Sequence, residues 1–254
     1  MSRIVAANWK MNGTRADWRT WARKAQENAQ GLNNVTPVLC VPAPALADVV
    51  DHIGPQVKLG GQDVHPAKEG AHTGYISAGM LKEFQCNYCI IGHSERRHYE
   101  SLIETNAAIA NKAQALIDDD IVPILCVGES LSLREAGQAA QAVYDQLEEC
   151  LHKVLVDDPA ELVIAYEPVW AISAAGSGRT PTTDEIDEIF QTIRTLLMGK
   201  YGDMGKDIKI LYGGSVKPEN IHSILDIHGV GGVLVGAASL KTEVFAELMR
   251  LADR

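Results

Sequence analysis

Three side chains that could take part in acid–base chemistry each follow a short apolar run, although they lie far apart in the sequence. They are Lys10, His93 and Glu167, and two further polar residues, Asn8 and Glu95, lie beside the first two. An ammonium group stabilises developing negative charge, an imidazole donates a hydrogen bond or a proton, and a carboxylate accepts a proton. Gathered in one site, these groups would suit general acid–base chemistry on a small molecule.

Small residues follow two later apolar runs and could bind an anion. Gly213-Gly214-Ser215 comes after one run, and Gly236 and Ala237 come after the last. Exposed backbone N–H groups at such places are what a phosphate group needs, above all at the start of a helix. The same residues could also form only a tight turn and a helix cap.

Each polar residue has a plainer interpretation when it is taken alone. Lys10 could reach solvent from a strand end, and His93 could cap the helix that begins with Ser94. Glu167 favours a function more strongly, because a carboxylate at the end of a buried strand is costly unless it is paired or functional.

The elements that must position these residues are indicated by apolar runs rich in Val, Ile and Leu, which are typical of buried parallel strands. The runs are Ile4–Asn8, Val38–Val41, Val57–Gly61, Tyr88–Gly92, Val122–Val127, Leu162–Tyr166, Lys209–Tyr212 and Gly232–Val235. Between them lie stretches with helical spacing, and Thr182-Thr183-Asp184 with Glu185 predicts the start of one helix.

Alternating strands and helices predict parallel pairing through right-handed crossovers. Eight such units favour a closed (β/α)8 barrel, an α/β fold with a parallel eight-stranded sheet and outer helices, over an open doubly wound sheet. No linker divides the chain, so residues 1–254 are expected to form a single domain. In a barrel all the strands end on one face, where the polar residues named above would meet.

Composition restricts the class of partner. The formal net charge of −10 disfavours nucleic acid and anionic membranes. The first residues have no apolar signal segment, and no apolar run reaches the ~18 residues of a membrane span, so we expect a cytoplasmic protein. The pair Cys86 and Cys89 favours packing over a zinc site. Gly229-x-Gly231 lacks the third glycine of a dinucleotide fingerprint, and no nucleotide cofactor is indicated.

Five segments of the chain closely resemble the triosephosphate isomerase family, in the order in which that family has them. The segments are Ala7-Asn8-Trp9-Lys10-Met11-Asn12-Gly13, Ile91-Gly92-His93-Ser94-Glu95-Arg96-Arg97, Ala165-Tyr166-Glu167-Pro168-Val169-Trp170-Ala171-Ile172, Tyr212-Gly213-Gly214-Ser215-Val216 and Leu234-Val235-Gly236. The resemblance covers nearly the whole chain. It implies a TIM barrel that interconverts dihydroxyacetone phosphate and D-glyceraldehyde 3-phosphate, a step of glycolysis and gluconeogenesis, through an enediolate and without a metal or coenzyme.

The resemblance also implies a role for each matching residue. Glu167 would be the catalytic base. His93 would be a neutral electrophile, a tuning for which this family is itself the standard example. Lys10 and Asn8 would bind and orient the substrate, and Glu95 would bond to Lys10 or to the loop that closes over the site.

The remaining implied contacts concern the phosphate and the oligomer. The backbone of Ser215, Gly236 and Ala237 would hold the phosphate. The segment Ala71-His72-Thr73-Gly74-Tyr75 resembles a loop through which each subunit of a homodimer inserts Thr73 beside the other subunit's site.

The chain departs from the family pattern at two places in the phosphate site. Ser173-Ala174-Ala175 precede Gly176 in the loop after Ile172, and of Ser173 and Gly176 we choose Gly176 as the phosphate-binding residue. Ala237 stands where a second glycine is usual, and it would need a backbone conformation open to alanine.

Two other functions remain open at this point. A Schiff-base lyase or aldolase would use Lys10 as the nucleophile. A barrel that has lost catalysis could serve as a scaffold.

Overall fold

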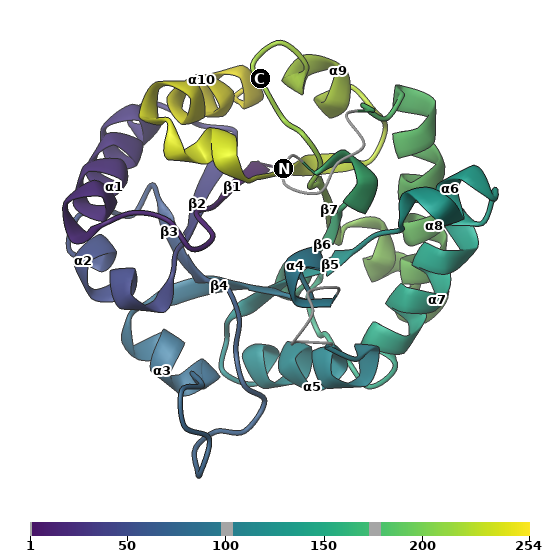
Figure 1. The fold of residues 1–254 in the computed structure, drawn as a ribbon, viewed down its shortest axis with the longest axis horizontal. Coiled ribbons are helices and arrows are strands. Elements are labelled where there is room, and N and C mark those ends of the chain that lie inside the picture. Colours follow the sequence, from purple (N-terminus) through teal and green to yellow (C-terminus); the bar gives the residue numbers. More distant parts are fainter. Residues whose placement is uncertain (1, 98–103, 173–178) are drawn as a thin grey trace.

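A computed structural model describes residues 2–97, 104–172 and 179–254 of the chain (Figure 1). Eight parallel strands form a closed barrel in sequence order, and β1 pairs with β8 to complete it. The strands are β1 Arg3–Asn8, β2 Val35–Cys40, β3 Lys58–Gly61, β4 Cys86–Ile91, β5 Val122–Val127, β6 Val163–Tyr166, β7 Lys209–Tyr212 and β8 Val230–Val235. The closed barrel confirms the predicted fold and excludes the open sheet.

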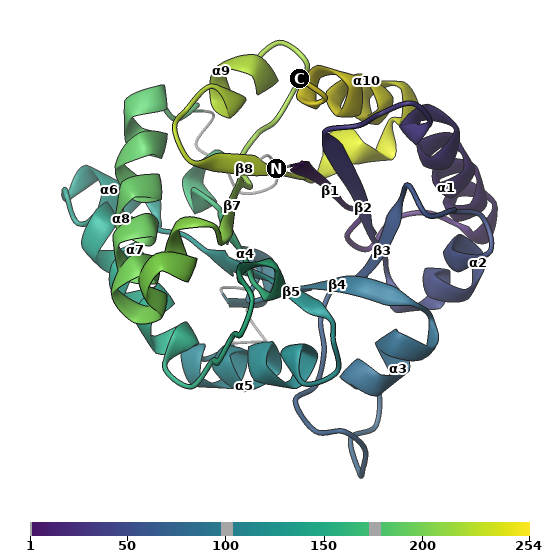
Figure 2. The ribbon, with the colours of Figure 1, turned by 180° about the vertical axis from the view of Figure 1, so that it is seen from behind.

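The helices surround the barrel, as the views from the two ends show (Figures 1 and 2). They are α1 Arg15–Ala29, α2 Leu46–Val50, α3 Ala78–Glu83, α4 Ser94–Arg97, α5 Asn106–Ile117, α6 Leu131–Glu135, α7 Ala139–Leu151, α8 Thr183–Tyr201, α9 Ile221–Leu225 and α10 Thr242–Ala252. Short 3-10 turns are η1 Ala43–Ala45, η2 Pro159–Glu161, η3 Val169–Ala171, η4 Gly202–Lys206 and η5 Ala237–Leu240. No helix in the described part of the chain is long and apolar enough to cross a membrane.

The hydrophobic core has two parts, as the alternation of side chains along a barrel strand requires. A small cluster that includes Ile4, Val38 and Leu211 fills the barrel interior, and a larger one lies between the strands and the helices. The predicted start of α8 is confirmed, because the Thr182 hydroxyl accepts from the Glu185 N–H while the Glu185 carboxylate accepts from the Thr182 N–H. The larger cluster packs the helices against the outside of the strands.

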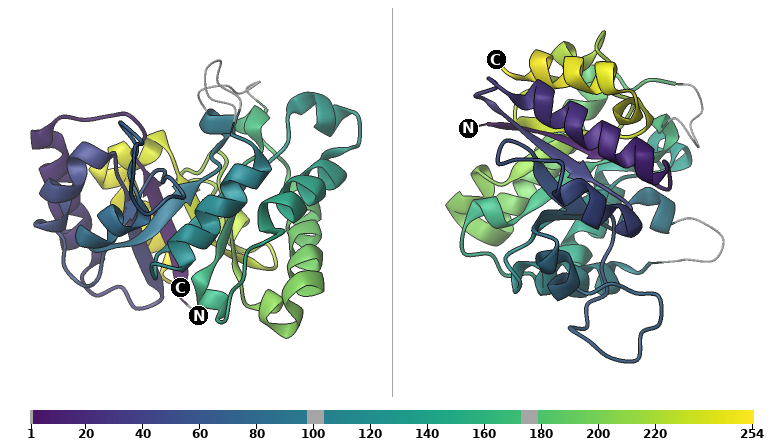
Figure 3. Two further views of the ribbon diagram at one scale, coloured as in Figure 1. Left: turned by 90° about the horizontal axis from the view of Figure 1, so that it is seen from below. Right: turned by 90° about the vertical axis from the view of Figure 1, so that its left-hand side faces the viewer.

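One connection leaves the outline of the barrel. Residues 62–77, between β3 and α3, project as a long loop at the bottom of Figure 1 and in the right-hand view of Figure 3. The ring centroids of His65 and His72 lie 4.0 Å apart, and those of His65 and Tyr75 lie 4.9 Å apart. These ring contacts give the projecting loop a defined shape.

Candidate active site

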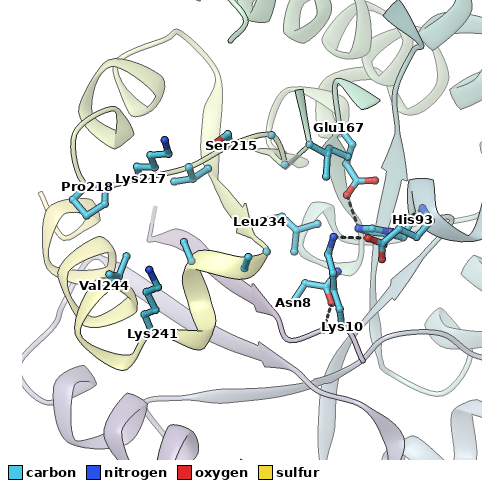
Figure 4. Close-up of a pocket in the computed structure, with 18 of the residues that line it drawn as sticks. Asn8, Lys10, His93, Glu167, Ser215, Lys217, Pro218, Leu234, Lys241 and Val244 are labelled. Carbon is cyan, nitrogen blue, oxygen red and sulfur yellow. Dashed lines mark hydrogen bonds and ion pairs between the residues drawn. The ribbon is translucent and has the colours of Figure 1, made fainter. Parts of the chain in front are cut away.

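The polar residues at the strand ends meet in one cavity of about 500 Å³ at the carboxyl-terminal face of the barrel (Figure 4). Its walls include the expected residues Asn8, Lys10, His93, Glu95, Glu167, Ser215, Gly236 and Ala237. They come from the ends of β1, β4, β6, β7 and β8, so the barrel gathers side chains that are scattered in the sequence. Of the other expected residues, Thr73 is exposed on the projecting loop, outside this cavity, and Gly176 lies outside the described residues.

The Glu167 carboxylate is only 2% exposed, and both of its oxygens are bonded. One oxygen lies 3.0 Å from Nε2 of His93, and the other accepts the Ser94 N–H at 3.0 Å. Burial raises the pKa of this carboxyl, but His93, the Ser94 N–H and Lys10 lower it by more, so the pKa falls below its ordinary value of 4.5. A buried carboxylate that stays ionised can act as a base at neutral pH.

His93 both caps a helix and faces the cavity. Its Nδ1 accepts the Glu95 N–H at 3.1 Å, which caps the short helix α4, while its Nε2 faces Glu167 in the cavity. Burial lowers the pKa of the ring, but the Glu167 carboxylate raises it by more while the two groups are in contact. The bond from the Glu95 N–H disfavours a second proton on the ring, because Nδ1 must stay unprotonated to accept it. The expected neutral ring therefore depends on where Glu167 lies.

Lys10 is held in an unusual backbone conformation. Its φ is +53°, in the left-handed region that few residues other than glycine adopt. The Lys10 N–H donates to Oδ1 of Asn8 at 3.0 Å, and the Lys10 carbonyl accepts from Nε2 of Gln62 at 3.1 Å. Its ammonium pairs with Glu95 at 2.6 Å. Of the two partners expected for Glu95, the structure shows Lys10.

Backbone N–H groups after β7 and β8 line the other side of the cavity. In the described part of the chain, the N–H groups of Ser215, Gly236 and Ala237 have no hydrogen-bond acceptor. Ala237 begins the turn η5 and has no positive φ, so alanine fits where the family pattern has glycine. Convergent N–H groups without acceptors can bind an anion.

Two buried or partly buried polar residues that brace the strand ends were missed by the sequence analysis, although each follows a glycine at a strand end. Gln62 comes after β3 and bridges the carbonyls of Lys10 and Cys40, at 3.1 and 3.0 Å. Glu129 comes after β5, is 1% exposed, and accepts from Nε1 of Trp170 at 2.9 Å and from the Tyr166 hydroxyl at 3.1 Å. A search for polar residues within two positions of the end of every predicted strand would have found both.

The cysteines take no part in this cavity. Cys86 and Cys89 are buried in β4, and burial raises the pKa of both thiols. Among the described residues there is no group of three or more His, Cys, Asp or Glu side chains placed to hold a metal ion.

Comparisons with known proteins agree with this geometry. A family model described as "Triosephosphate isomerase" matches residues 3–252. A triosephosphate isomerase from Thermus thermophilus is 43% identical over 252 residues, which cover 98% of each chain. One from Hyphomonas neptunium is 41% identical over 250 residues, with the same coverage. The crystal structure of triosephosphate isomerase from Bartonella henselae aligns with all of both chains, with a TM-score of 0.87 and 35% identity.

These matches extend over the whole barrel and include every strand that contributes to the cavity. The chain belongs to the triosephosphate isomerase family and is an isomerase that interconverts dihydroxyacetone phosphate and D-glyceraldehyde 3-phosphate.

Proposed function

We propose that Glu167 is the base that carries the proton between the two adjacent carbons of the substrate. The observation that carries this proposal is the buried Glu167 carboxylate, which lies 3.0 Å from Nε2 of His93 in the same cavity as the Lys10 ammonium. The carboxylate removes a proton from the carbon next to the carbonyl and returns it to the neighbouring carbon. To reach carbon, it must first leave the His93 ring and the Ser94 N–H.

His93 and Lys10 stabilise the negative charge that forms on the substrate oxygens. Nε2–H of His93 donates to the carbonyl oxygen and then to the enediolate, and the Lys10 ammonium also lines the cavity. Because the old carbonyl oxygen gains a proton and the neighbouring hydroxyl oxygen loses one, Nε2 of His93 also passes a proton between these two oxygens. Asn8 holds the Lys10 backbone through its side-chain oxygen, so it orients the ammonium. The close Lys10–Glu95 pair argues against an aldolase, because a Schiff base needs a neutral amine.

The phosphate of the substrate is proposed to lie on the N–H groups of Ser215, Gly236 and Ala237. Those groups have no acceptor in the described structure and lie on the cavity wall across from His93. This position places the carbonyl end of a three-carbon phosphate near Glu167. A further contact from Gly176 stays a prediction.

Replacement of the base tests the proposal. Glu167→Gln should lower kcat by ~10²–10⁴-fold or more, because it removes general-base catalysis while keeping the shape of the side chain. The matched control is Glu148→Gln, which changes the charge equally at an exposed position on α7. A coupled assay of glyceraldehyde 3-phosphate isomerisation gives the rate, and inhibition by orthophosphate shows that the variant still binds anions. Near-normal turnover by Glu167→Gln would refute the role of the base.

We also propose a two-fold homodimer in which each site is complete only when the partner supplies Thr73. Support comes from a second cavity of about 340 Å³, which is lined by Lys10 and His93 and could receive a side chain from a partner. Thr73 of the same chain does not line this cavity. Large apolar side chains are exposed after β1, on the projecting loop, on α3 and directly after α3. They are Met11, Tyr75, Met80 and Phe84, and Met11 is 96% exposed.

Mixed dimers test whether the partner contributes. Thr73→Arg leaves Glu167 intact but blocks insertion of the loop, whereas Glu167→Gln leaves the loop intact. If each site needs the partner's Thr73, mixing the two inactive variants should restore activity, because the mixed dimer contains one complete site. Activity no higher than that of the separate variants, or sedimentation of a fully active monomer at micromolar concentration, would contradict the proposal.

The remaining proposals concern the whole chain. We propose that residues 1–254 act as one catalytic domain and that the enzyme works in the cytoplasm. The single closed barrel supports the first, and membership of a glycolytic enzyme family together with five free, buried thiols supports the second. Fractionation of the native cells would test the location.

A further inference from the structure

The active-site cavity extends past the proposed phosphate position into an outer arm. A volume of about 500 Å³ lies in the ~300–1,000 Å³ range of pockets that hold drug-sized ligands, far more than a three-carbon phosphate needs. The walls of this outer arm are formed by the loop after β7 and by the segment from η5 to α10. They consist of Lys217, Pro218, Glu219, Ala238, Lys241 and Val244.

Two lysines of the outer arm carry uncompensated charge. Lys217 lies on the loop after β7 and Lys241 directly before α10, on facing walls of the arm (Figure 4). Neither ammonium has a hydrogen-bond or ion-pair partner within the described ranges. Of the ten other lysines, five are paired with carboxylates in the described part of the chain, and the whole chain has a net charge of −10. They are Lys10, Lys24, Lys82, Lys112 and Lys206.

The two lysines lie beyond the phosphate position as seen from the reacting groups. The N–H groups of Ser215, Gly236 and Ala237 belong to the same two connections, but they precede Lys217 and Lys241 along them, close to the strand ends. One anionic group on these N–H groups therefore leaves the lysines free to bind a second. Pro218 and Val244 provide apolar surface beside them, and Glu219 reduces the positive charge of the arm by one.

We propose that the outer arm is a second anion subsite, which binds the outer phosphoryl group of a ligand whose first phosphoryl group occupies the N–H cradle. The ligand class is a diphosphate or a sugar bisphosphate. Such a molecule blocks the phosphate position of the triose phosphate and acts as a competitive inhibitor. The inference rests on the proposed phosphate position.

Competitive inhibition by two inorganic probes tests the subsite. Orthophosphate can fill only the cradle, whereas pyrophosphate carries two linked phosphoryl groups and can also reach the lysines. We expect pyrophosphate to bind more tightly to the unaltered enzyme. In Lys217→Met/Lys241→Met, its inhibition constant should rise about tenfold, since an exposed ion pair contributes up to a few-fold in binding and two are removed. The constant for orthophosphate should rise less than about threefold.

Two further variants separate the subsite from a general effect of charge. Lys153→Met/Lys200→Met removes the same charge at helix ends on the opposite face of the barrel and should leave the ratio of the two inhibition constants unchanged. Glu219→Gln removes the negative charge from the arm and should tighten pyrophosphate binding by about two- to threefold.

The outcomes distinguish the subsite from the cradle. Equal losses for both ions in the Lys217→Met/Lys241→Met variant, or pyrophosphate binding no tighter than orthophosphate in the unaltered enzyme, would overturn the second subsite and leave the cradle standing. If orthophosphate does not compete with substrate at all, the proposed phosphate position is wrong, and the subsite falls with it.

Discussion

Gly213 is the position where the smallest change should move Glu167, the proposed catalytic base. It follows β7 directly, and its N–H donates to the Tyr166 carbonyl at 2.7 Å, so that N–H is not part of the phosphate cradle. A Cβ atom at this position would lie 2.9 Å from Cγ of Glu167. Since Gly213 has no positive φ, alanine can adopt the backbone conformation. Gly213→Ala therefore crowds the stem of Glu167 most, and the Tyr166 carbonyl oxygen, at 3.2 Å from the added Cβ, less.

The size of the effect follows from the contact distance. Ordinary Cβ contacts begin near 3.4 Å, so the stem of Glu167 must retreat by about 0.5 Å. A displacement of ~1 Å in a catalytic group can cost ~10²-fold in rate, and half of that displacement should cost about tenfold. That loss corresponds to about 1.4 kcal/mol in the activation free energy. It should appear in kcat, with KM nearly unchanged.

Initial rates in the coupled isomerase assay, measured with thermal unfolding, provide the test. Gly199→Ala is the matched control, because a Cβ there meets nothing within 4 Å and the residue lies inside α8. It should keep full activity and raise the free energy of unfolding by about 0.5–1 kcal/mol. If Gly213→Ala turns over within twofold of the unaltered enzyme, or if its loss lies in KM alone, the position of Glu167 does not limit the rate.

Three other perturbations test the supports of the site. Gln62→Ala should lower kcat/KM about tenfold with little change in the melting temperature, because the left-handed backbone of Lys10 is held in part by the bond from Gln62. An unchanged rate would show that this bond is dispensable. Glu129→Gln should lower the free energy of unfolding in urea by about 3 kcal/mol, since it breaks the buried ion pair of Glu129 with Arg134. A loss below 1 kcal/mol would contradict that account. The Glu167 carboxyl, followed by NMR, should titrate below pH 4.5, so the stability it provides is present above pH 4.5 and is lost as the pH falls through that lowered pKa. His93→Asn should raise the midpoint of this titration. An unmoved midpoint would exclude the His93 ring as a cause of the lowered pKa.

Most strand ends on the catalytic face could be predicted from the sequence, because buried parallel strands are short apolar runs followed by a polar residue or glycine. The strand starts were less certain. β2 begins at Val35, three residues before the expected Val38, although Pro37 lies between them. Its pairing with β1 runs unbroken from Val35 to Cys40, so tertiary pairing overrides the local signal of a proline.

The start of β8 shows what the sequence could not reveal about closure of the barrel. It begins at Val230, although Gly231 and Gly232 resemble a turn. Gly232 has a φ of +147°, and a Cβ there would lie 1.9 Å from the Ile4 carbonyl oxygen. The glycine is needed because β8 approaches β1 at this point, a contact between the two ends of the chain that no local pattern records.

In the active site, the residue types were predictable but their couplings were not. Polar residues directly after the strands, such as Lys10, His93 and Glu167, were correctly expected to meet in one cavity. The Lys10–Glu95 pair and the contact between His93 and Glu167, however, depend on how far apart different strands lie. Thr73 is a different case, because its proposed contact lies with another subunit and so depends on an interface as well as on this fold.

The short helix α4 links the roles proposed for Glu167 and His93. Its backbone supplies the Ser94 N–H to Glu167 and the Glu95 N–H to Nδ1 of His93. The bond at Nδ1 leaves the ring proton on Nε2, facing the carboxylate. A substrate oxygen that takes the place of the carboxylate at Nε2 removes the contact that raises the pKa of the ring, while the bond at Nδ1 remains. In the proposed mechanism the same displacement would free Glu167 to act as a base and leave His93 as a neutral donor, so one event at the start of α4 would prepare both groups for proton transfer.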